Sequence, residues 1–181
     1  MRAMGCALLG ACVLGGLTWP VQAQPTQVVV VRHAEKSGLP VDDPDLSPEG
    51  QARAQALARL LQPADVSTII VTSYRRTQQT AAPLASQQGV TPWVIAPGKG
   101  GMAVHVQQVV EAVNRASGVV LVVGHSNTVP AIVAALSRSR PGALCETSFS
   151  HLFVLTPLVA DAPALHLRYG VPDAPAQEGC L

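Results

Sequence analysis

Hydrophobic positions along the chain follow two patterns, short unbroken runs and longer stripes with helical spacing. Unbroken β-branched or aliphatic runs predict buried strands at 28–31, 67–72, 93–95, 119–123 and 152–155, and clean alternation predicts one more at 164–169. Stripes spaced three and four residues apart predict helices between Ser47 and Pro63, over 75–88, around 106–113 and over 127–137. Ser47 and Pro48 are typical of a helix start, whereas Pro83 is expected to kink the second helix or to mark its true beginning.

These strands and helices alternate along the chain, which is typical of α/β domains. We therefore expect a largely parallel sheet with helices on both faces. In such sheets the ligand binds outside the carboxyl ends of the strands, so the polar residues at those ends carry the functional information. The tail from about residue 171 is rich in Pro and Ala and is expected to be irregular.

The first 23 residues have the pattern of a secretory signal peptide. Arg2 precedes an apolar run from Ala7 to Trp19, and Val21-Gln22-Ala23 has the small residues of a cleavage site. This run is shorter than the roughly 20 residues that span a bilayer. We expect cleavage after Ala23, export to the periplasm or the medium, and one domain over 24–181. An uncleaved membrane anchor, or a lipoprotein site at Cys12, is the alternative.

Cleavage after residue 23 leaves two cysteines in the chain, Cys145 and Cys180. Exported proteins form disulfides in their oxidising compartment, so we expect one bond between these two residues. It would tie the C-terminal tail to the segment that follows the last long helix. Two free thiols are the alternative.

Composition and charge narrow the class of protein. The chain has 181 residues, with 12 Lys and Arg against 11 Asp and Glu; 13% of its residues are charged and 48% hydrophobic. This chain is too apolar and too weakly charged to be disordered. It has no basic excess with which to displace counterions from phosphates, so we expect no nucleic-acid partner.

Basic and imidazole side chains follow three of the predicted strands. Arg32 and His33 end the first strand, Arg76 follows the second, and His125 follows the fourth. Arginine binds phosphate oxygens in bidentate fashion, and an imidazole nitrogen can attack phosphorus and carry the phosphoryl group. Two arginines and a protonated histidine would neutralise the phosphate without a metal. A zinc site of His33, His125 and His105 is the chemical alternative, although the arginines would repel a dication.

Four segments, in the right order, resemble the motifs of the histidine phosphatase superfamily, the phosphoglycerate mutase-like proteins. They are Val31-Arg32-His33-Ala34-Glu35-Lys36, Leu46-Ser47-Pro48-Glu49-Gly50 with Gln51-Ala52-Arg53-Ala54, Ser73-Tyr74-Arg75-Arg76-Thr77-Gln78-Gln79-Thr80-Ala81, and Val123-Gly124-His125-Ser126. The resemblance extends from Val28 to about Leu136. It implies a three-layer α/β/α sandwich on a mixed, mostly parallel six-stranded sheet, in which one late strand is antiparallel.

The resemblance also implies roles for individual residues. His33 would be the nucleophile that becomes phosphorylated, and Arg32, Arg76 and His125 would complete the pocket around the phosphoryl group. Arg76 matches the family motif because it directly precedes the Thr-x-Gln-Thr-Ala stretch. Arg75 is expected to be a solvated residue at the helix start, with a contact to substrate at the rim of the site as the alternative.

The sequence departs from the family pattern at the proton donor. Many members carry a Glu after the third strand that protonates the leaving group, but residues 96–102 contain no carboxylate here. The donor is therefore unassigned, and the candidates are Glu35, Asp42, Asp43, Asp45, His105 and Glu146. Glu35 is expected instead to orient the pocket arginines, and Ser126 and Ser73 to support the phosphate pocket.

The remaining histidines fit ordinary structural positions. We expect His105 to face solvent at the start of a helix, with a contact to substrate as the alternative. His151 is expected to lie near the surface, and His166 on the polar side of its strand.

Together these features predict a small exported phosphatase that hydrolyses a phosphoester through a phosphohistidine on His33, with no metal and no cofactor. Its partner would be a small phosphorylated molecule or a phosphoprotein, and a membrane only if the N-terminal segment is retained. Two alternatives use the same site: a phosphohistidine-protein phosphatase, and a phosphate-binding relative without catalysis, which the missing acid favours. A metal-dependent hydrolase is a third.

Overall fold

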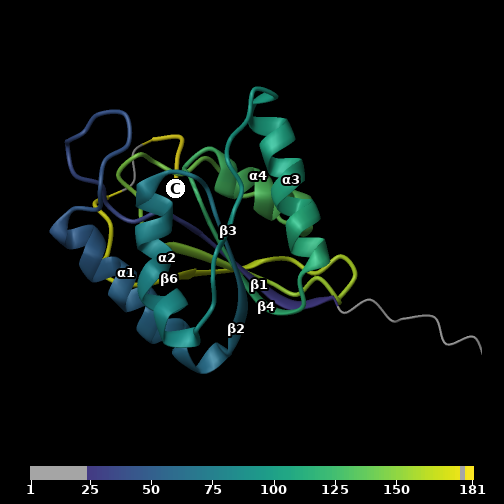
Figure 1. Cartoon of the computed structure of the whole chain (residues 1–181). Helices are drawn as coiled ribbons and strands as arrows, with labels where there is room; N and C mark the ends of the chain where they lie inside the picture. The colour runs from purple at the N-terminus through teal and green to yellow at the C-terminus, as the bar shows by residue number, and fades with distance from the viewer. Residues whose placement is uncertain (1–23, 176–177) are drawn as a thin grey trace, which may run out of the picture.

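The computed structural model describes residues 24–175 and 178–181, which form an α/β fold around one six-stranded sheet (Figure 1). The signal peptide expected over residues 1–23 lies outside the described residues. In chain order the elements are β1 (Pro25–Arg32), α1 (Pro48–Leu61), the short 3₁₀ helix η1 (Gln62–Ala64), β2 (Val66–Val71), α2 (Arg75–Gln88), β3 (Trp93–Val94), α3 (Gly101–Arg115), β4 (Gly118–Gly124), α4 (Thr128–Leu136), β5 (His151–Leu155) and β6 (Leu165–Arg168).

The sheet has the strand order β3-β2-β4-β1-β5-β6 and is mixed. Parallel pairs join β1 to β4 and β2 to both β3 and β4. β5 is antiparallel to both of its neighbours, β1 and β6. The expectation of a mostly parallel sheet with one antiparallel late strand is therefore confirmed, and the carboxyl ends of β1, β2 and β4 meet at one edge.

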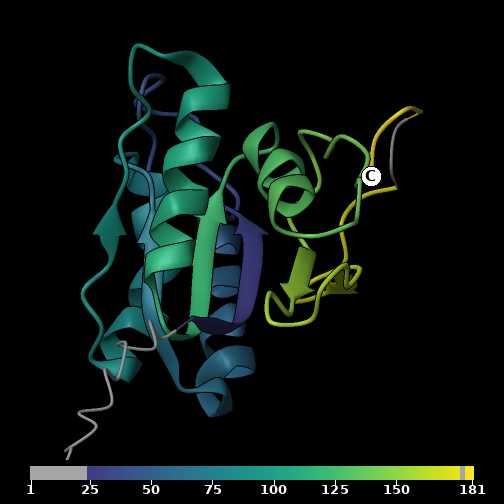
Figure 2. The same ribbon diagram turned by 90° about the vertical axis from the view of Figure 1, so that its right-hand side faces the viewer.

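Helices cover both faces of the sheet, which confirms the three-layer sandwich. Figure 2 shows α3 and α4 in front of the strands and α1 and α2 behind them. Val28 and Val30 of β1 belong to the apolar cluster that includes α3 and α4, whereas Val29 and Val31 belong to the cluster with α1 and α2. Successive side chains of a strand point to opposite faces, so a strand buried on both faces needs an unbroken apolar run.

The helix α2 differs from its expected form, because it runs through Pro83 without interruption from Arg75 to Gln88. Pro83 therefore does not mark the beginning of this helix. The proline lacks an N–H group, so one backbone hydrogen bond is missing inside α2.

The start of α1 packs directly against the loop that follows β1. Ser47 caps the helix by accepting a hydrogen bond from the Gly50 amide at 3.2 Å, and its own amide donates to the carbonyl of Glu35 at 2.9 Å. A side chain at Gly50 would overlap that same Glu35 carbonyl oxygen. Gly50 is therefore required by the close approach of two backbone segments.

The C-terminal tail is irregular, as expected, yet it is tied to the domain at two places. A disulfide joins Cys145 and Cys180, whose Cα atoms lie 5.1 Å apart. Asp173 accepts hydrogen bonds from the backbone amides of Phe149 and Ser150, at 2.8 and 3.0 Å. Both ties reach the segment between α4 and β5.

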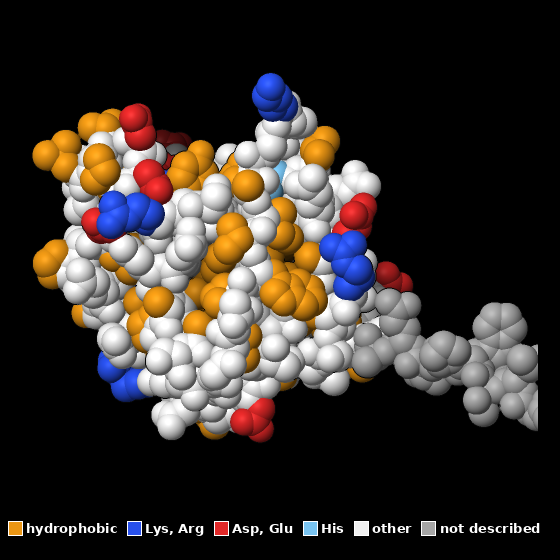
Figure 3. All heavy atoms as spheres, viewed as in Figure 1, with side chains coloured by type: hydrophobic (Ala, Val, Ile, Leu, Met, Phe, Trp, Pro, Cys, Tyr) orange, Lys and Arg blue, Asp and Glu red, His pale blue; other side chains and the backbone are white. Residues whose placement is uncertain are grey.

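The surface has few charges and one apolar area at the sheet edge. Hydrophobic side chains gather over the middle of the face shown in Figure 3, where β3 lies, and the charged ones lie around its margins. Trp93 and Val94 of β3 are 44% and 54% exposed. No helix in the described part of the chain is long and apolar enough to cross a membrane.

Candidate active site

The two motif histidines meet at the edge where β1 and β4 end. Arg32 pairs with Gly124 in the parallel register, and the amide of His33 donates to the Gly124 carbonyl at 2.9 Å. The rings of His33 and His125 therefore lie with their centroids 5.4 Å apart in an edge-to-face arrangement. A cavity of about 490 Å³ opens beside them, lined by His33, Lys36, Tyr74, Arg76, Pro97, Gly98, Gly101, Met102, His105, His125, Ser126, Asn127, Thr128 and Glu146.

The orientation of His33 determines which of its nitrogens can react. Its Nδ1 lies 2.8 Å from the backbone carbonyl oxygen of Ala34. A carbonyl can only accept a hydrogen bond, so Nδ1 carries the proton and Nε2 keeps a free lone pair. Burial, followed by the charge of Arg32, lowers the pKa of His33 to about 3. At neutral pH the ring is therefore an uncharged imidazole with a nucleophilic Nε2.

His125 is also neutral in this state. Its Nε2 lies 3.2 Å from Thr72 Oγ1, and its amide donates to Thr128 Oγ1 at 3.0 Å. Burial and then the charge of Arg76 lower the pKa of His125 to about 4. An anion bound beside the ring would favour its protonated form.

Arg32 is almost completely buried, with 1% of its surface exposed. Its Nη1 donates to the carbonyls of Cys145 and Ser148 at 2.7 and 3.0 Å, and its Nη2 donates to Glu146 Oε2 at 2.9 Å. The guanidinium carbon lies 4.3 Å from the centre of the Phe149 ring. Its Nε is buried and has no hydrogen-bond partner among the described residues, and Arg32 itself is not among the residues that line the cavity.

Arg76 and Arg75 stand side by side at the start of α2 but face different surroundings. Arg76 lines the cavity, lies 4.2 Å from the centre of the Tyr74 ring, and has a buried Nε without a partner in the described part of the chain. Arg76 Nη1 is 3.7 Å from Asp43 Oδ1. Arg75 is half exposed and pairs instead with Asp45 at 2.6 Å. The structure thus brings Arg76, and not Arg75, to the two histidines.

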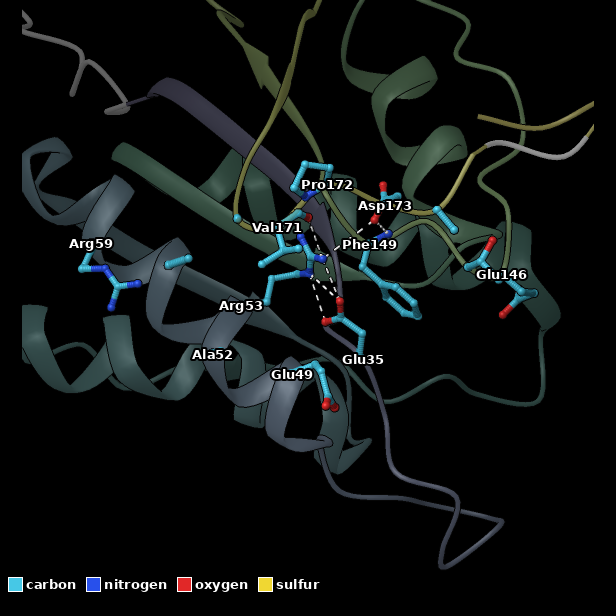
Figure 4. Close-up of a pocket in the computed structure, with 14 residues that line it drawn as sticks. Glu35, Glu49, Ala52, Arg53, Arg59, Glu146, Phe149, Val171, Pro172 and Asp173 are labelled. Carbon is cyan, nitrogen blue, oxygen red and sulfur yellow. Dashed lines mark hydrogen bonds and ion pairs between the residues drawn. The ribbon is translucent and has the colours of Figure 1, made fainter.

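The expectation for Glu35 is wrong. Glu35 does not contact Arg32 or Arg76, because its carboxylate pairs with Arg53 of α1, at 2.7 Å from Nη2 to Oε1 and 2.9 Å from Nε to the same oxygen (Figure 4). Arg53 is only 5% exposed and also donates to the carbonyls of residues 169 and 171 in the C-terminal tail. Arg53 belongs to one of the four family-like segments, but its buried position was not expected, since an arginine in an amphipathic helix is ordinarily solvated.

A second and larger cavity lies next to the histidine site. It has a volume of about 710 Å³ and shares only Glu146 with the first (Figure 4). Its lining comes from the loop after β1, from α1, from the segment before β5 and from the C-terminal tail: Glu35, Glu49, Ala52, Arg53, Ala56, Arg59, Glu146, Thr147, Phe149, Gly170, Val171, Pro172, Asp173 and Ala174. Although this cavity is the larger of the two, the imidazoles of His33 and His125 open into the smaller one.

Three further residues differ from expectation. Ser73 is exposed and does not line the histidine cavity, and its backbone carbonyl accepts from Gln78. His151 is fully buried instead of near the surface, because it starts β5 and bonds the exposed His166 at 2.8 Å between Nδ1 and Nε2. His105 is 4% exposed and lines the cavity, whereas a solvent-facing position was expected.

Helical phase explains the position of His105. The buried residues of α3 are His105, Val109, Ala112 and Val113, so the stripe that faces the sheet begins at His105 and not at Val106. One residue along a helix turns the side chain by about 100°, which carries a histidine from solvent into the cavity.

Among the six proton-donor candidates, only two line the histidine cavity, His105 and Glu146. Glu146 accepts from Ser126 Oγ at 2.5 Å and pairs with Arg32. The hydrogen bond from Ser126 and the charge of Arg32 hold the pKa of Glu146 below its usual value. No group of three or more His, Cys, Asp or Glu within the described residues is placed to hold a metal ion.

A family model and several solved structures match this chain. The model described as the histidine phosphatase superfamily (branch 1) matches residues 28–98. A search of curated proteins gives no match.

The matching structures share the fold over most of their length. A candidate phosphohistidine phosphatase SixA from Agrobacterium tumefaciens is 23% identical, with a TM-score of 0.57 over 83% of this chain and 100% of its own. The protein histidine phosphatase SixA complexed with tungstate is 17% identical, with a TM-score of 0.58 over 79% and 95%. A mycobacterial glucosyl-3-phosphoglycerate phosphatase with inorganic phosphate is 17% identical, with a TM-score of 0.56 over 82% and 97%.

Proposed function

We propose that this chain, whose residues 28–98 match the model of the histidine phosphatase superfamily, is a member of that superfamily and a metal-independent phosphatase of phosphoric monoesters that works through a phosphohistidine on His33. The observation that carries the proposal is the fixed tautomer of His33. The hydrogen bond from Nδ1 to the Ala34 carbonyl leaves Nε2 unprotonated, in the cavity that Arg76 and His125 also line.

The proposed reaction has two steps. In the first, His33 Nε2 attacks phosphorus, the N–P bond forms, and the bond from phosphorus to the leaving oxygen breaks. In the second, water attacks the phosphohistidine and releases phosphate. The unpartnered Nε atoms of Arg32 and Arg76, together with His125, would stabilise the negative charge of the phosphoryl oxygens.

The test is hydrolysis of p-nitrophenyl phosphate by residues 24–181 in the presence of EDTA, beside the His33→Ala variant. We expect turnover that resists the chelator and is lost in the variant, and an acid-labile phosphorylated protein after rapid quenching. Turnover retained by His33→Ala would refute the mechanism. Loss of wild-type turnover in EDTA would favour a metal-dependent hydrolase, and phosphate binding without turnover would favour a non-catalytic relative.

A phosphohistidine-bearing protein is the second candidate substrate. Leu39 and Val41, in the loop that follows Lys36, are 74% and 77% exposed, and Met102 on the cavity wall is 50% exposed. Met102 borders the cavity, and the loop with Leu39 and Val41 begins at Lys36, which also lines it, so these exposed hydrophobic side chains offer a contact for a protein surface. A kcat/KM for a phosphohistidine protein well above that for p-nitrophenyl phosphate, and reduced in Leu39→Ser, would support this substrate; equal reduction on both substrates would not.

We also propose that residues 1–23 are a cleaved signal peptide and that the protein works in an oxidising compartment outside the cytoplasm. The disulfide between Cys145 and Cys180 supports this, because such bonds persist in oxidising compartments. Mass analysis of the protein recovered from the periplasm or medium of an expressing bacterium tests it. A chain that begins at Gln24 is expected, and a full-length chain kept in the cytoplasm would refute export.

A further inference from the structure

His105 is a buried polar side chain in the cavity wall. The two reaction steps proposed above assign it no role. It lies in the second turn of α3, lines the cavity together with His33 and His125, and is only 4% exposed. Its buried Nδ1 has no hydrogen-bond partner among the described residues. A buried imidazole nitrogen without a partner is unfavourable, so a ring kept in this place points to a contact with bound substrate.

The charged side chains around the cavity leave a net positive charge smaller than the negative charge of a bound phosphate monoester. The charge of Arg32 is offset by Glu146 at 2.9 Å, and that of Arg76 is partly offset by Asp43 at 3.7 Å. Lys36 is the remaining cation in the cavity wall. A phosphate monoester dianion brings two negative charges, so its binding favours protonation of a histidine in the wall.

The two other histidines and the carboxyl group of the wall each already have a task or a partner. His33 must stay unprotonated at Nε2 to attack phosphorus, and His125 Nε2 already faces the Thr72 hydroxyl. Among the described residues, Glu146 is the only carboxyl group in the wall, and its bonds to Ser126 and Arg32 keep it ionised. Of the three histidines in the wall, His105 is the one without an assigned role, and its Nδ1 has no hydrogen-bond partner among the described residues.

We propose that His105 is the proton donor to the leaving-group oxygen, a role for which residues 96–102 supply no carboxylate. This inference rests on the phosphatase function proposed above. In the first step the imidazolium of His105 gives its proton to the oxygen that leaves phosphorus, and becomes neutral. In the second step neutral His105 takes a proton from the attacking water as the N–P bond of His33 breaks, and returns to its starting state.

The test compares two substrates whose leaving groups differ in their need for a proton. p-Nitrophenolate leaves without one, whereas the alkoxide of glycerol phosphate does not. General acid catalysis contributes about 10²–10⁴-fold. We therefore expect His105→Asn and His105→Gln to lower kcat/KM for glycerol phosphate by at least about 100-fold, and that for p-nitrophenyl phosphate by less than about 10-fold. Gln108→Asn, an exposed position on the same helix, is the control for a general effect on α3.

The aryl substrate also reports whether each variant is folded, because its hydrolysis needs the intact site around His33. An equal loss on both substrates in both His105 variants would overturn the proposal and indicate a structural role. A selective loss in Glu146→Gln, with none in the His105 variants, would assign the donor to Glu146 instead. A wild-type protein that hydrolyses neither substrate would refute the phosphatase function itself, which is a separate failure.

Discussion

Replacement of Arg53 by Met removes a buried charge on which several segments depend, and it retains the apolar stem of the side chain. Arg53 lies on α1, and its guanidinium contacts the loop after His33 through Glu35 and the C-terminal tail through two carbonyls (Figure 4). Asp173, whose side chain is 4% exposed, lies 3.9 Å from Nη2. Three parts of the chain that are distant in sequence therefore converge on one side chain.

The cost of Arg53→Met follows from what the substitution leaves behind. Glu35 would keep a negative charge with its side chain only 23% exposed, and the carbonyls of residues 169 and 171 would lose a charged donor. Removal of one partner of a buried ion pair costs about 3–5 kcal/mol. At about 2–4 °C per kcal/mol for a domain of this size, the midpoint of thermal unfolding should fall by roughly 6–20 °C.

The assay is guanidinium-induced unfolding of residues 24–181, followed by circular dichroism at pH 7. Arg59→Met is the matched control, because Arg59 lies on the same helix and is exposed. A surface substitution of this kind should change the free energy of unfolding by no more than about 0.5 kcal/mol. Equal destabilisation by the two substitutions would refute the reasoning, since the ion pair would then contribute nothing specific.

A double variant separates the ion pair from packing. In Arg53→Met with Glu35→Gln, no unpaired carboxylate remains, so the double variant should be less destabilised than the sum of the two single variants. Contacting charged residues typically show a coupling of about 0.5–3 kcal/mol. Strict additivity would mean that the loss in Arg53→Met comes from the hydrocarbon stem or from the tail carbonyls and not from Glu35.

Three other predictions concern pH, one glycine and the disulfide. The pKa values of all five histidines are lowered in the fold, that of His33 to about 3. The unfolded chain therefore binds more protons than the folded one below about pH 6.5, so the free energy of unfolding should fall as the pH drops from there. Denaturation at pH 6, 5 and 4 should show that His33→Asn reduces the dependence of this free energy on pH by up to about 1.4 kcal/mol per pH unit. An unchanged dependence would contradict the burial of the His33 ring. Gly50→Ala should prevent folding or strongly lower the midpoint of thermal unfolding, because the added methyl group would overlap the Glu35 carbonyl oxygen. Gly38→Ala is the control: the space around Gly38 is open, so the free energy of unfolding should change by no more than about 0.5 kcal/mol. Protein exported without reductant and then unfolded should show no reaction with a thiol reagent at Cys145 or Cys180; two reactive thiols would mean that the bond does not form.

The local elements and their order could be read from the pattern of side chains. A strand buried on both faces must be apolar throughout, so the valine run of β1 marks the strand and its end marks the sheet edge. Polar residues just beyond such ends necessarily lie at that edge. This is why Arg32, His33 and His125 could be placed together from the sequence. In the structure His33 and His125 line one cavity with Arg76, and Arg32, directly before His33, is buried.

The partners of the charged and imidazole side chains were decided by the tertiary structure alone. Glu35 could have met any of three arginines, and the close approach of α1 at Gly50 gave it Arg53. His105 fits either solvent or a cavity, and the phase of α3 put it in the cavity wall. Hydrophobic periodicity predicts the buried face of an element to within about one residue. In a helix, an error of one residue turns the predicted direction of a side chain by about 100°. Polar side chains are stable on either side of that boundary, so only packing between distant segments selects their contacts.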